Sequence, residues 1–243
     1  MLSIKKDPSF VDKQVPFAVL EVHFPEDKSQ WDLEAFEALK AAELAEIRGR
    51  FAADGETAEG AEGAEHAEGA EHAAAAYERK AVFGENPYFR YFKKFKKSYP
   101  VMMQLESYLL KGRPFPSGNP INEIAFLAEL KTQILLGSHD IDRIEGDMVV
   151  FCGTEKTDFT GMRGDTIHIY PGDVSARDDR GIILSMIAGA DDRTYITEDS
   201  RNIAYIFFGT DKTPEDQFDW MAELLGGYIH TLAPAAEIQL VRA

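Results

Sequence analysis

The order of helical and strand-like patterns along the chain is the feature that most constrains its fold. Helical periodicity dominates before about residue 136, and short apolar runs rich in β-branched residues dominate after it. Runs of helices followed by runs of strands are typical of mixed domains in which helices flank a sheet. We therefore predict a mixed α/β (α+β) domain with a sheet or barrel-like β core and flanking helices.

Apolar periodicity, caps and turn residues give the expected bounds of the elements. Asp32 is the expected N-cap of the first long helix. The expected helices cover residues 33–47, 89–99, 101–110, 122–135 and 216–226. The expected strands cover residues 15–22, 148–151, 166–170, 181–187, 202–208 and 238–241.

Charge and cysteine content narrow the function classes. The 243 residues carry a net charge of −16 and hold one cysteine, Cys152. One cysteine excludes a disulfide framework within the chain and a multi-cysteine zinc site, and its place at the end of a strand indicates a buried structural thiol. No apolar run approaches the roughly 18 residues of a membrane helix. Lys5, Lys6 and Asp7 lie where a signal peptide would need an apolar stretch, so we expect a cytoplasmic protein. No phosphate loop or dinucleotide, metal or nucleophile motif occurs, so we expect no cofactor and no metal.

A low-complexity stretch interrupts the pattern between the first two expected helices. Residues 56–76 repeat Ala-Glu-Gly and Ala-Glu-His units and contain almost no large apolar side chain. Such a stretch cannot bury a core face, so we interpret residues 54–76 as an acidic insertion. His66 and His72 are six residues apart, whereas helical ligand pairs are spaced by three or four.

A short cationic segment lies between two acidic halves. Residues 85–118 hold seven basic and two acidic residues, and aromatic side chains alternate with the basic ones. The spacing of Phe89, Phe92, Phe95 and Tyr99 predicts one apolar stripe with much of the positive charge off it. The segment is either a solvated helix surface or a face that binds a phosphate backbone. On the second interpretation the expected nucleic-acid contacts are Arg90, Lys93, Lys94, Lys96, Lys97, Lys111 and Arg113.

Several landmarks follow one another from about residue 85 onward. An aromatic-basic helix precedes a helix that ends in Lys-Gly-Arg-Pro at residues 111–114, and Asn119-Pro120 then opens a helix with Glu123 one turn in. An Asp-apolar-Asp-basic run with Gly-Asp after it occupies residues 140–147, with His139 directly before it. An acidic-Arg-Thr turn at residues 191–194 leads through Thr197 and Asn202 into a strand.

This ordered set resembles the B3/B4 domain, the tRNA-editing domain of the phenylalanyl-tRNA synthetase beta subunit, and more closely the free-standing proteins built from that domain alone. The resemblance implies one B3/B4-like domain over residues 1–243, with the best match over 85–243. It implies a mixed sheet with flanking helices, tRNA as partner, and hydrolysis of mischarged aminoacyl-tRNA as the enzymatic activity. It leaves the catalytic residues unassigned. A non-catalytic module that binds an amino acid or a nucleotide on the same fold is the alternative.

The residues carried over by the resemblance have physical interpretations of their own. Asn119 lies where the backbone N–H groups of a helix start attract anions, or it only caps the helix. Glu123 faces the same pocket or is a first-turn acid favoured by the helix dipole. Asp192 and Arg193 contact an amino group or a phosphate, or form a solvated hairpin tip. The expected substrate-binding residues are Asn119, Glu123, Asp140, Asp192, Arg193 and Thr194.

Overall fold

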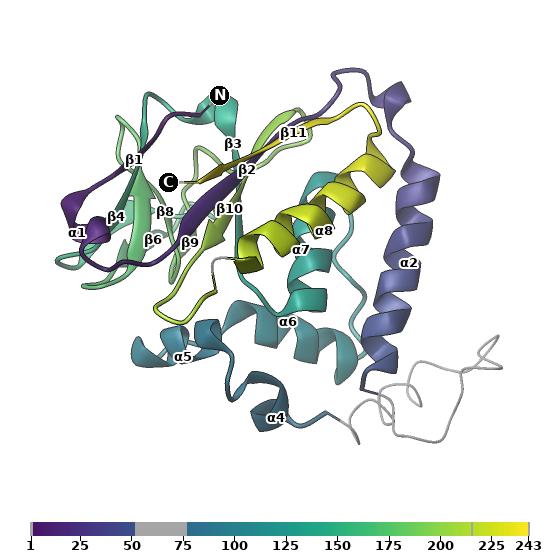
Figure 1. Cartoon of the computed structure of the whole chain (residues 1–243), viewed down its shortest axis with the longest axis horizontal. Coiled ribbons are helices and arrows are strands. Elements are labelled where there is room, and N and C mark those ends of the chain that lie inside the picture. The colour runs from purple at the N-terminus through teal and green to yellow at the C-terminus, as the bar shows by residue number, and fades with distance from the viewer. Residues whose placement is uncertain (1, 52–76, 215, 243) are drawn as a thin grey trace.

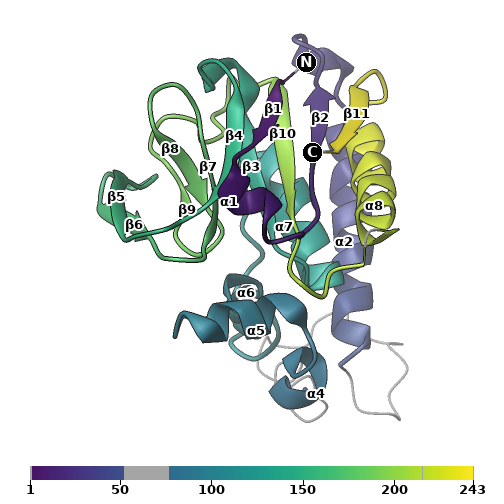
Figure 2. The same cartoon turned by 60° about the vertical axis from the view of Figure 1, so that its left-hand side comes forward.

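A computed structural model describes residues 2–51, 77–214 and 216–242 of the chain. The acidic stretch, the expected insertion 54–76 and its two histidines lie outside the described residues. The described residues form a five-stranded sheet, a four-stranded sheet and a layer of helices. Figures 1 and 2 show the four-stranded sheet between the five-stranded sheet and the helices α2, α7 and α8.

The strands of the two large sheets come from both ends of the chain. Their orders are β1-β4-β7-β8-β9 and β11-β2-β10-β3, and β5 pairs with β6 in a separate hairpin. The bounds are β1 Ile4–Lys6, β2 Phe17–His23, β3 Leu136–Asp140, β4 Met148–Cys152, β5 Thr157–Thr160, β6 Thr166–Ile169, β7 Val174–Arg177, β8 Ile182–Ser185, β9 Gly189–Ala190, β10 Asn202–Phe208 and β11 Glu237–Arg242. The predicted mixed α+β class is therefore confirmed. The β core of the described residues consists of open sheets and not of a closed barrel.

Most of the long helices pack together on one side of the four-stranded sheet. Their bounds are α1 Pro8–Val11, α2 Leu33–Gly49, α4 Arg79–Phe83, α5 Pro87–Lys94, α6 Pro100–Leu109, α7 Pro120–Thr132 and α8 Asp216–Leu232, with 3₁₀ turns at Lys28–Gln30 and Ile141–Arg143. Helices α2, α7 and α8 pack against one another beside the four-stranded sheet, and α6 packs on α7. Within the described residues, no helix combines the length and the apolarity that crossing a bilayer requires.

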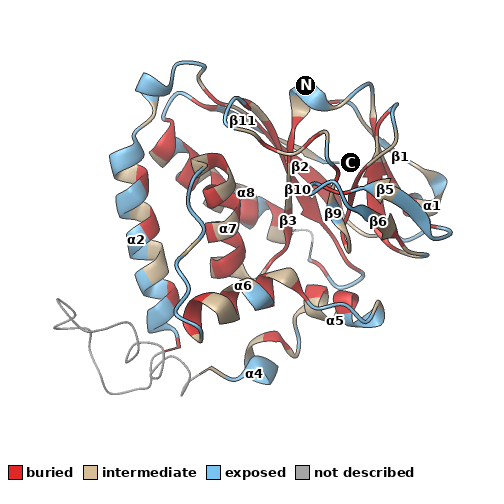
Figure 3. Cartoon of the chain, turned by 180° about the vertical axis from the view of Figure 1, so that it is seen from behind, coloured by how far each residue is buried: buried red, intermediate tan, exposed pale blue. Residues whose placement is uncertain are grey.

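Strand β10 is the centre of the core. It pairs antiparallel with β2 along all of its length and with β3 on its other side. Every residue after Asn202 in this strand is buried, and Figure 3 shows the buried residues concentrated on the central strands and on α7. The Tyr205 hydroxyl donates a hydrogen bond of 2.8 Å to the carbonyl of Ile121 in α7. This bond fixes the helical layer to the sheet at the point where α7 begins.

Helix α8 is longer than its sequence pattern predicts. The expected end was Gly226, but the helix runs through Gly226 and Gly227 to Leu232. Glycine inside a helix costs about 1 kcal/mol relative to alanine. The buried side chains of Tyr228, Ile229 and Leu232 continue the apolar face beyond the glycines. Their burial outweighs the local preference of glycine.

The aromatic-basic helix is shorter than predicted, and its stripe is different. Helix α5 ends at Lys94, because Lys96 adopts the left-handed conformation with φ +56°. The side chains buried by α5 are Tyr88, Tyr91 and Phe92, whereas Phe89 and Phe95 are only half-buried. Tyr99 is buried as the N-cap of α6. Phe89, Phe92, Phe95 and Tyr99 all contact the core, but they do not form one helical stripe, because the helix ends before Lys96.

Strand β3 is absent from the predicted strands, and it begins directly after the expected helix 122–135. Helix α7 ends three residues earlier, where Gln133 adopts the left-handed conformation with φ +57°. The chain then enters β3, which pairs with β10 through register pairs such as Ser138 with Tyr205. β3 is an edge strand of the four-stranded sheet.

Candidate functional site

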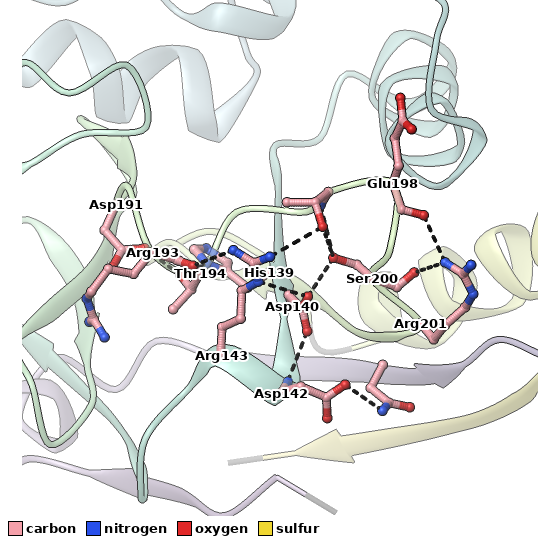
Figure 4. Close-up of polar contacts among 12 residues, drawn as sticks. His139, Asp140, Asp142, Arg143, Asp191, Arg193, Thr194, Glu198, Ser200 and Arg201 are labelled. Carbon is pink, nitrogen blue, oxygen red and sulfur yellow. Dashed lines mark hydrogen bonds and ion pairs between the residues drawn. The ribbon is translucent and has the colours of Figure 1, made fainter. Parts of the chain in front are cut away.

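Three residues expected to bind substrate meet around the loop that precedes β10. The Asn119 side chain caps α7 by accepting from the N–H of Ile121 at 3.0 Å, and its Nδ2 donates to the carbonyl of Thr197 at 3.1 Å. The N–H of Asp140 donates to the carbonyl of Thr194 at 2.8 Å. The Asp140 carboxylate accepts from the Ser200 hydroxyl at 2.5 Å. These contacts, of which the one between Asp140 and Ser200 is drawn in Figure 4, stabilise the loop.

Arg193 and Asp192 point to different surroundings. The guanidinium of Arg193 binds both oxygens of Asp178, at 3.0 and 3.2 Å, and its Nε lies 3.1 Å from the Asp191 carboxylate. Both carboxylates are buried, so they occupy this guanidinium. Asp192 is exposed, and its backbone N–H donates to Thr160.

Glu123 lies on the inner side of α7, away from the cavities described below. One of its carboxylate oxygens is 2.5 Å from Nζ of Lys40 in α2, and the other accepts from the N–H of Gly118 at 2.8 Å. Both charged side chains are nearly buried, with 7% and 10% of their surface exposed. Glu123 therefore connects two helices within the helical layer.

A cavity of about 510 Å³ opens between the edge strand β3, helix α7 and the segment from β8 to β9. Its wall is mostly apolar, and this volume suits an amino-acid side chain with its backbone atoms. Apolar wall residues include Phe126, Leu136, Leu184, Met186, Ile196 and Phe208. Its polar groups come from Gln104, Asn122, Glu129, Ser138, His139, Arg163, Ser185 and Tyr195. We call this space the β3 cavity.

His139 is the best-organised polar group of the β3 cavity. Its Nδ1 lies 2.7 Å from the Thr194 hydroxyl, which itself donates to the buried Asp191 carboxylate at 2.5 Å. Because the hydroxyl proton goes to Asp191, the oxygen must accept from Nδ1–H. Burial lowers the pKa of His139 to about 4, so the ring is neutral at pH 7. Its Nε2 then carries a lone pair. Figure 4 labels His139, Thr194 and Asp191.

Ser138 contributes an open backbone edge to the same cavity. The N–H groups of Leu136 and Asp140 both point away from β10, to the Glu129 carboxyl at 2.9 Å and to Thr194. Alternate residues of a strand direct their backbone groups to the same side. The N–H of Ser138 therefore points away from β10 as well, at the edge where this residue lines the cavity.

Glu129 supplies a second group with an unusual protonation state. Its side chain is fully buried in α7, and burial raises its pKa from the usual 4.5 to about 8. It is therefore mostly a neutral carboxylic acid at pH 7. A buried neutral acid and a neutral histidine in the wall of one cavity are typical of sites that handle protons.

The raised pKa of Glu129 predicts a pH-dependent stability. The unfolded chain ionises this carboxyl above pH 4.5 while the folded chain keeps its proton up to about pH 8. Stability is therefore lost as pH rises, by up to about 1.4 kcal/mol per pH unit. We expect Glu129→Gln to flatten the dependence between pH 6.5 and 8, measured by urea unfolding. An equal slope in both proteins would contradict the assignment. This window lies above the pKa of Asp173, the other acid raised by burial, to about 6.

A second cavity, of about 690 Å³, continues the first along α6. The two spaces share Pro100, Gln104, Phe126 and Arg163 in their walls, so they are neighbours. The second cavity adds the exposed Arg113 together with Tyr108 and Phe115. We call it the α6 groove. The guanidinium groups of Arg113 and Arg163 and several aromatic rings therefore lie next to the β3 cavity.

The structure divides the expected nucleic-acid contacts into separate sets. Arg90 is 2.5 Å from the Glu85 carboxylate and donates to the Gly84 carbonyl. The side chains of Lys93, Lys94, Lys96 and Lys97 are exposed around the end of α5. Lys111 and Arg113 follow α6, whose ten residues separate them from α5 by about 15 Å. Of these seven residues, only Arg113 lines the α6 groove.

Sequence reasoning did not assign three residues of this site. His139 belongs to the resemblance without a role there, and neither Glu129 nor Arg163 is among the predicted site residues. A carboxyl within the apolar run Ile124–Ile134 was a usable signal for Glu129. Arg163 had no such signal, because it lies in the turn between β5 and β6 and reaches the groove only through the fold.

Comparison with known proteins gives a family match. A family model of the B3/4 domain matches residues 85–213. Among solved structures, the chain is similar to an N-terminal fragment of the phenylalanyl-tRNA synthetase beta subunit from Pyrococcus horikoshii, with a TM-score of 0.45 and 8% identity. That alignment covers 100% of this chain and 54% of the fragment, so the chain spans about half the length of the fragment. No curated protein matches the chain. Because the family model matches more than half of the 243 residues, the chain belongs to the B3/4 domain family.

Proposed function

We propose that this protein binds the 3′ end of an aminoacylated tRNA and hydrolyses the ester between the amino acid and the ribose. The observation that supports this most is that the β3 cavity and the α6 groove are neighbours with different chemistry. The β3 cavity has the size for an aminoacyl group and holds a neutral histidine and a neutral acid. The α6 groove beside it holds Arg113 and Arg163 with aromatic rings, which suit phosphates and bases.

The proposed reaction is attack by water on the ester carbonyl. The lone pair on Nε2 of His139 accepts a proton from the water as its oxygen bonds to the carbonyl carbon. The N–H of Ser138 stabilises the resulting oxyanion by hydrogen bonding. The bond from carbon to the ribose oxygen then breaks, and the proton passes from Nε2 to that oxygen. The products are the free amino acid and the tRNA with its ribose hydroxyl restored, so atoms and protons balance.

Thr194 and Asp191 are positioning residues in this scheme. Their hydrogen bonds hold the ring in the tautomer that leaves Nε2 unprotonated. Thr194 was expected to bind substrate, and here its part is to orient His139. Asn119, Asp140 and Arg193 stabilise the loop that carries Thr194.

The test is a deacylation time course with purified protein. The substrates are phenylalanine tRNA mischarged with tyrosine and the same tRNA correctly charged with phenylalanine. We expect faster release of tyrosine than in buffer alone, and slower or no release of phenylalanine. No release from either, with a thermal shift caused by free tyrosine or phenylalanine, would support the non-catalytic amino-acid-binding module instead.

Charge reversal tests the role of the α6 groove. We expect Arg113→Glu combined with Arg163→Glu to weaken retention of aminoacylated tRNA on filters by about tenfold or more at low salt, since each phosphate contact contributes through counterion release. Lys111→Glu combined with Lys93→Glu is the matched control, because both lysines are exposed and neither lines the groove. An equal loss in the control would mean that only the overall charge matters, in a chain whose net charge is −16.

A further inference from the structure

A third cavity, of about 680 Å³, lies at the C-terminal end of α5. It is bounded by the segment between α1 and β2, the end of β4, the turn before β7 and the segment after β10. None of its lining residues lines the β3 cavity or the α6 groove. We call it the α5 cavity, and the proposed hydrolysis makes no use of it.

Two aromatic rings form part of the wall of the α5 cavity. The centroids of the Phe95 and Tyr170 rings are 6.0 Å apart, with an angle of 50° between the ring planes. The Tyr170 hydroxyl is held by Nε2 of His168 at 2.8 Å, and the Phe95 ring packs on the buried Tyr91. Phe95 and Tyr170 are only half-buried, so ring surface is left for a ligand. Half-buried, fixed aromatic rings are the surfaces on which planar rings stack.

Lysines from two distant segments converge on the same space. Lys13 comes from the segment after α1, whereas Lys94 and Lys96 come from the end of α5. All three are exposed, and none has a carboxylate partner within ion-pair distance among the described residues. Asp211 is the one acidic side chain in the wall, so the described lining has a net positive charge. The ammonium group of Lys97 stands 5.6 Å above the Tyr170 ring.

Local structure explains only part of this arrangement. Lysines at the end of a helix are favoured by its dipole, which accounts for Lys94. The dipole of α5 does not account for Lys13. It also does not account for a lysine at the left-handed position 96, where glycine is the residue of lowest backbone energy.

We propose that the α5 cavity binds a nucleoside phosphate, as a free nucleotide or as one unit of an RNA strand. The base stacks against Phe95 and Tyr170, and the phosphate binds Lys13, Lys94 and Lys96. An aromatic wall beside converging ammonium groups matches a planar ring with an anionic group attached. A free amino acid, by contrast, would leave the lysines without an anionic partner of matching charge.

Titration calorimetry with the whole chain at low salt tests this proposal. The probes are AMP, adenosine, inorganic phosphate and pentaadenylate. We expect AMP to bind at least tenfold more tightly than adenosine or phosphate, because only AMP carries both groups. Pentaadenylate binding tighter than AMP identifies the RNA strand as the source, and equal affinity identifies the free nucleotide. The absence of saturable binding of both AMP and pentaadenylate up to millimolar concentration overturns the proposal.

Two substitutions locate the binding. Lys94→Gln is expected to weaken AMP binding about fivefold to tenfold, whereas Lys93→Gln, on the same helix but outside the cavity, leaves it unchanged. Lys96→Gly removes an ammonium group and suits the left-handed backbone, so it should weaken AMP binding without lowering the melting temperature. Equal effects of the substitutions at 93 and 94 would exclude this cavity. Because AMP carries no aminoacyl ester, this result does not depend on the deacylation assay.

Discussion

His139→Ala is expected to slow the deacylation of mischarged tRNA by about a hundredfold or more, since a positioned base contributes factors of this size. The substitution removes the only ring nitrogen pair in the β3 cavity, and the Thr194 hydroxyl loses its donor. It does not touch the α6 groove, so retention of tRNA on filters should stay within twofold of the wild-type value. A rate equal to that of the wild-type protein would remove His139 from the mechanism.

Substitutions at Thr194 separate chemistry from structure. Thr194→Ser keeps the hydroxyl that accepts from His139 and donates to Asp191, so we expect most of the rate to remain. Thr194→Val keeps the shape but removes the acceptor for His139 Nδ1, while Asp191 keeps the Thr194 N–H and Arg193, so the rate should fall about tenfold or more. The melting temperature of each variant shows how much of any loss is due to unfolding. A rate that falls equally in both Thr194 variants would indicate a packing effect.

Lys40→Met is expected to lower the free energy of unfolding by about 2 to 3 kcal/mol, because it leaves the Glu123 carboxylate buried without its cation. The 7% exposure of the Glu123 side chain means that water cannot replace the ammonium group. The N–H of Gly118 remains as a hydrogen-bond donor to it, which limits the loss. Urea unfolding monitored by circular dichroism measures the difference.

The double variant Lys40→Met with Glu123→Gln isolates the charge. A neutral amide still accepts from Gly118 but needs no cation, so most of the lost stability should return. Lys5→Met is the surface control, because the Lys5 side chain is 64% exposed in its pair with Asp147. Equal destabilisation by the single and double variants would show that Lys40 acts through packing alone.

Local patterns in the sequence predicted much of the fold. The run Asn202–Phe208 forms a strand with the predicted bounds, because β-branched and aromatic residues bounded by polar ones specify a buried strand. Asp32 caps its helix by accepting from the N–H of Ala35, as expected. Cys152 is buried, and burial raises its pKa to about 11, which agrees with an inert structural thiol.

The errors lie where contacts between distant elements overrule local preference. The end of α8 beyond Gly226 depends on packing of residues that follow the glycines. The end of α5 depends on the left-handed Lys96, whose side chain carries no local signal for a helix stop. Strand β3 was missed because its sequence, Leu-Gly-Ser-His-Asp, has little strand propensity and is ordered by pairing with β10.

Some residues of the candidate site could be predicted from the sequence, and others could not. The sequence pointed to Asn119, Asp140 and Thr194, because caps, turns and the family resemblance mark the ends of elements. Which side chains face a cavity depends on how α7, β3 and the segment before β10 pack together. That packing turned Glu123 toward α2 and placed Glu129 and His139 at the β3 cavity.

By itself, the sequence determined the mixed class, the family, and the existence of one cationic segment between acidic halves. These follow from periodicity, composition and motif order, which act over neighbouring residues. The protonation states of His139 and Glu129, and the division of the basic residues between two cavities, depend on how distant segments pack. Burial and proximity across the chain set these properties, since the pKa shifts arise from desolvation in the packed core.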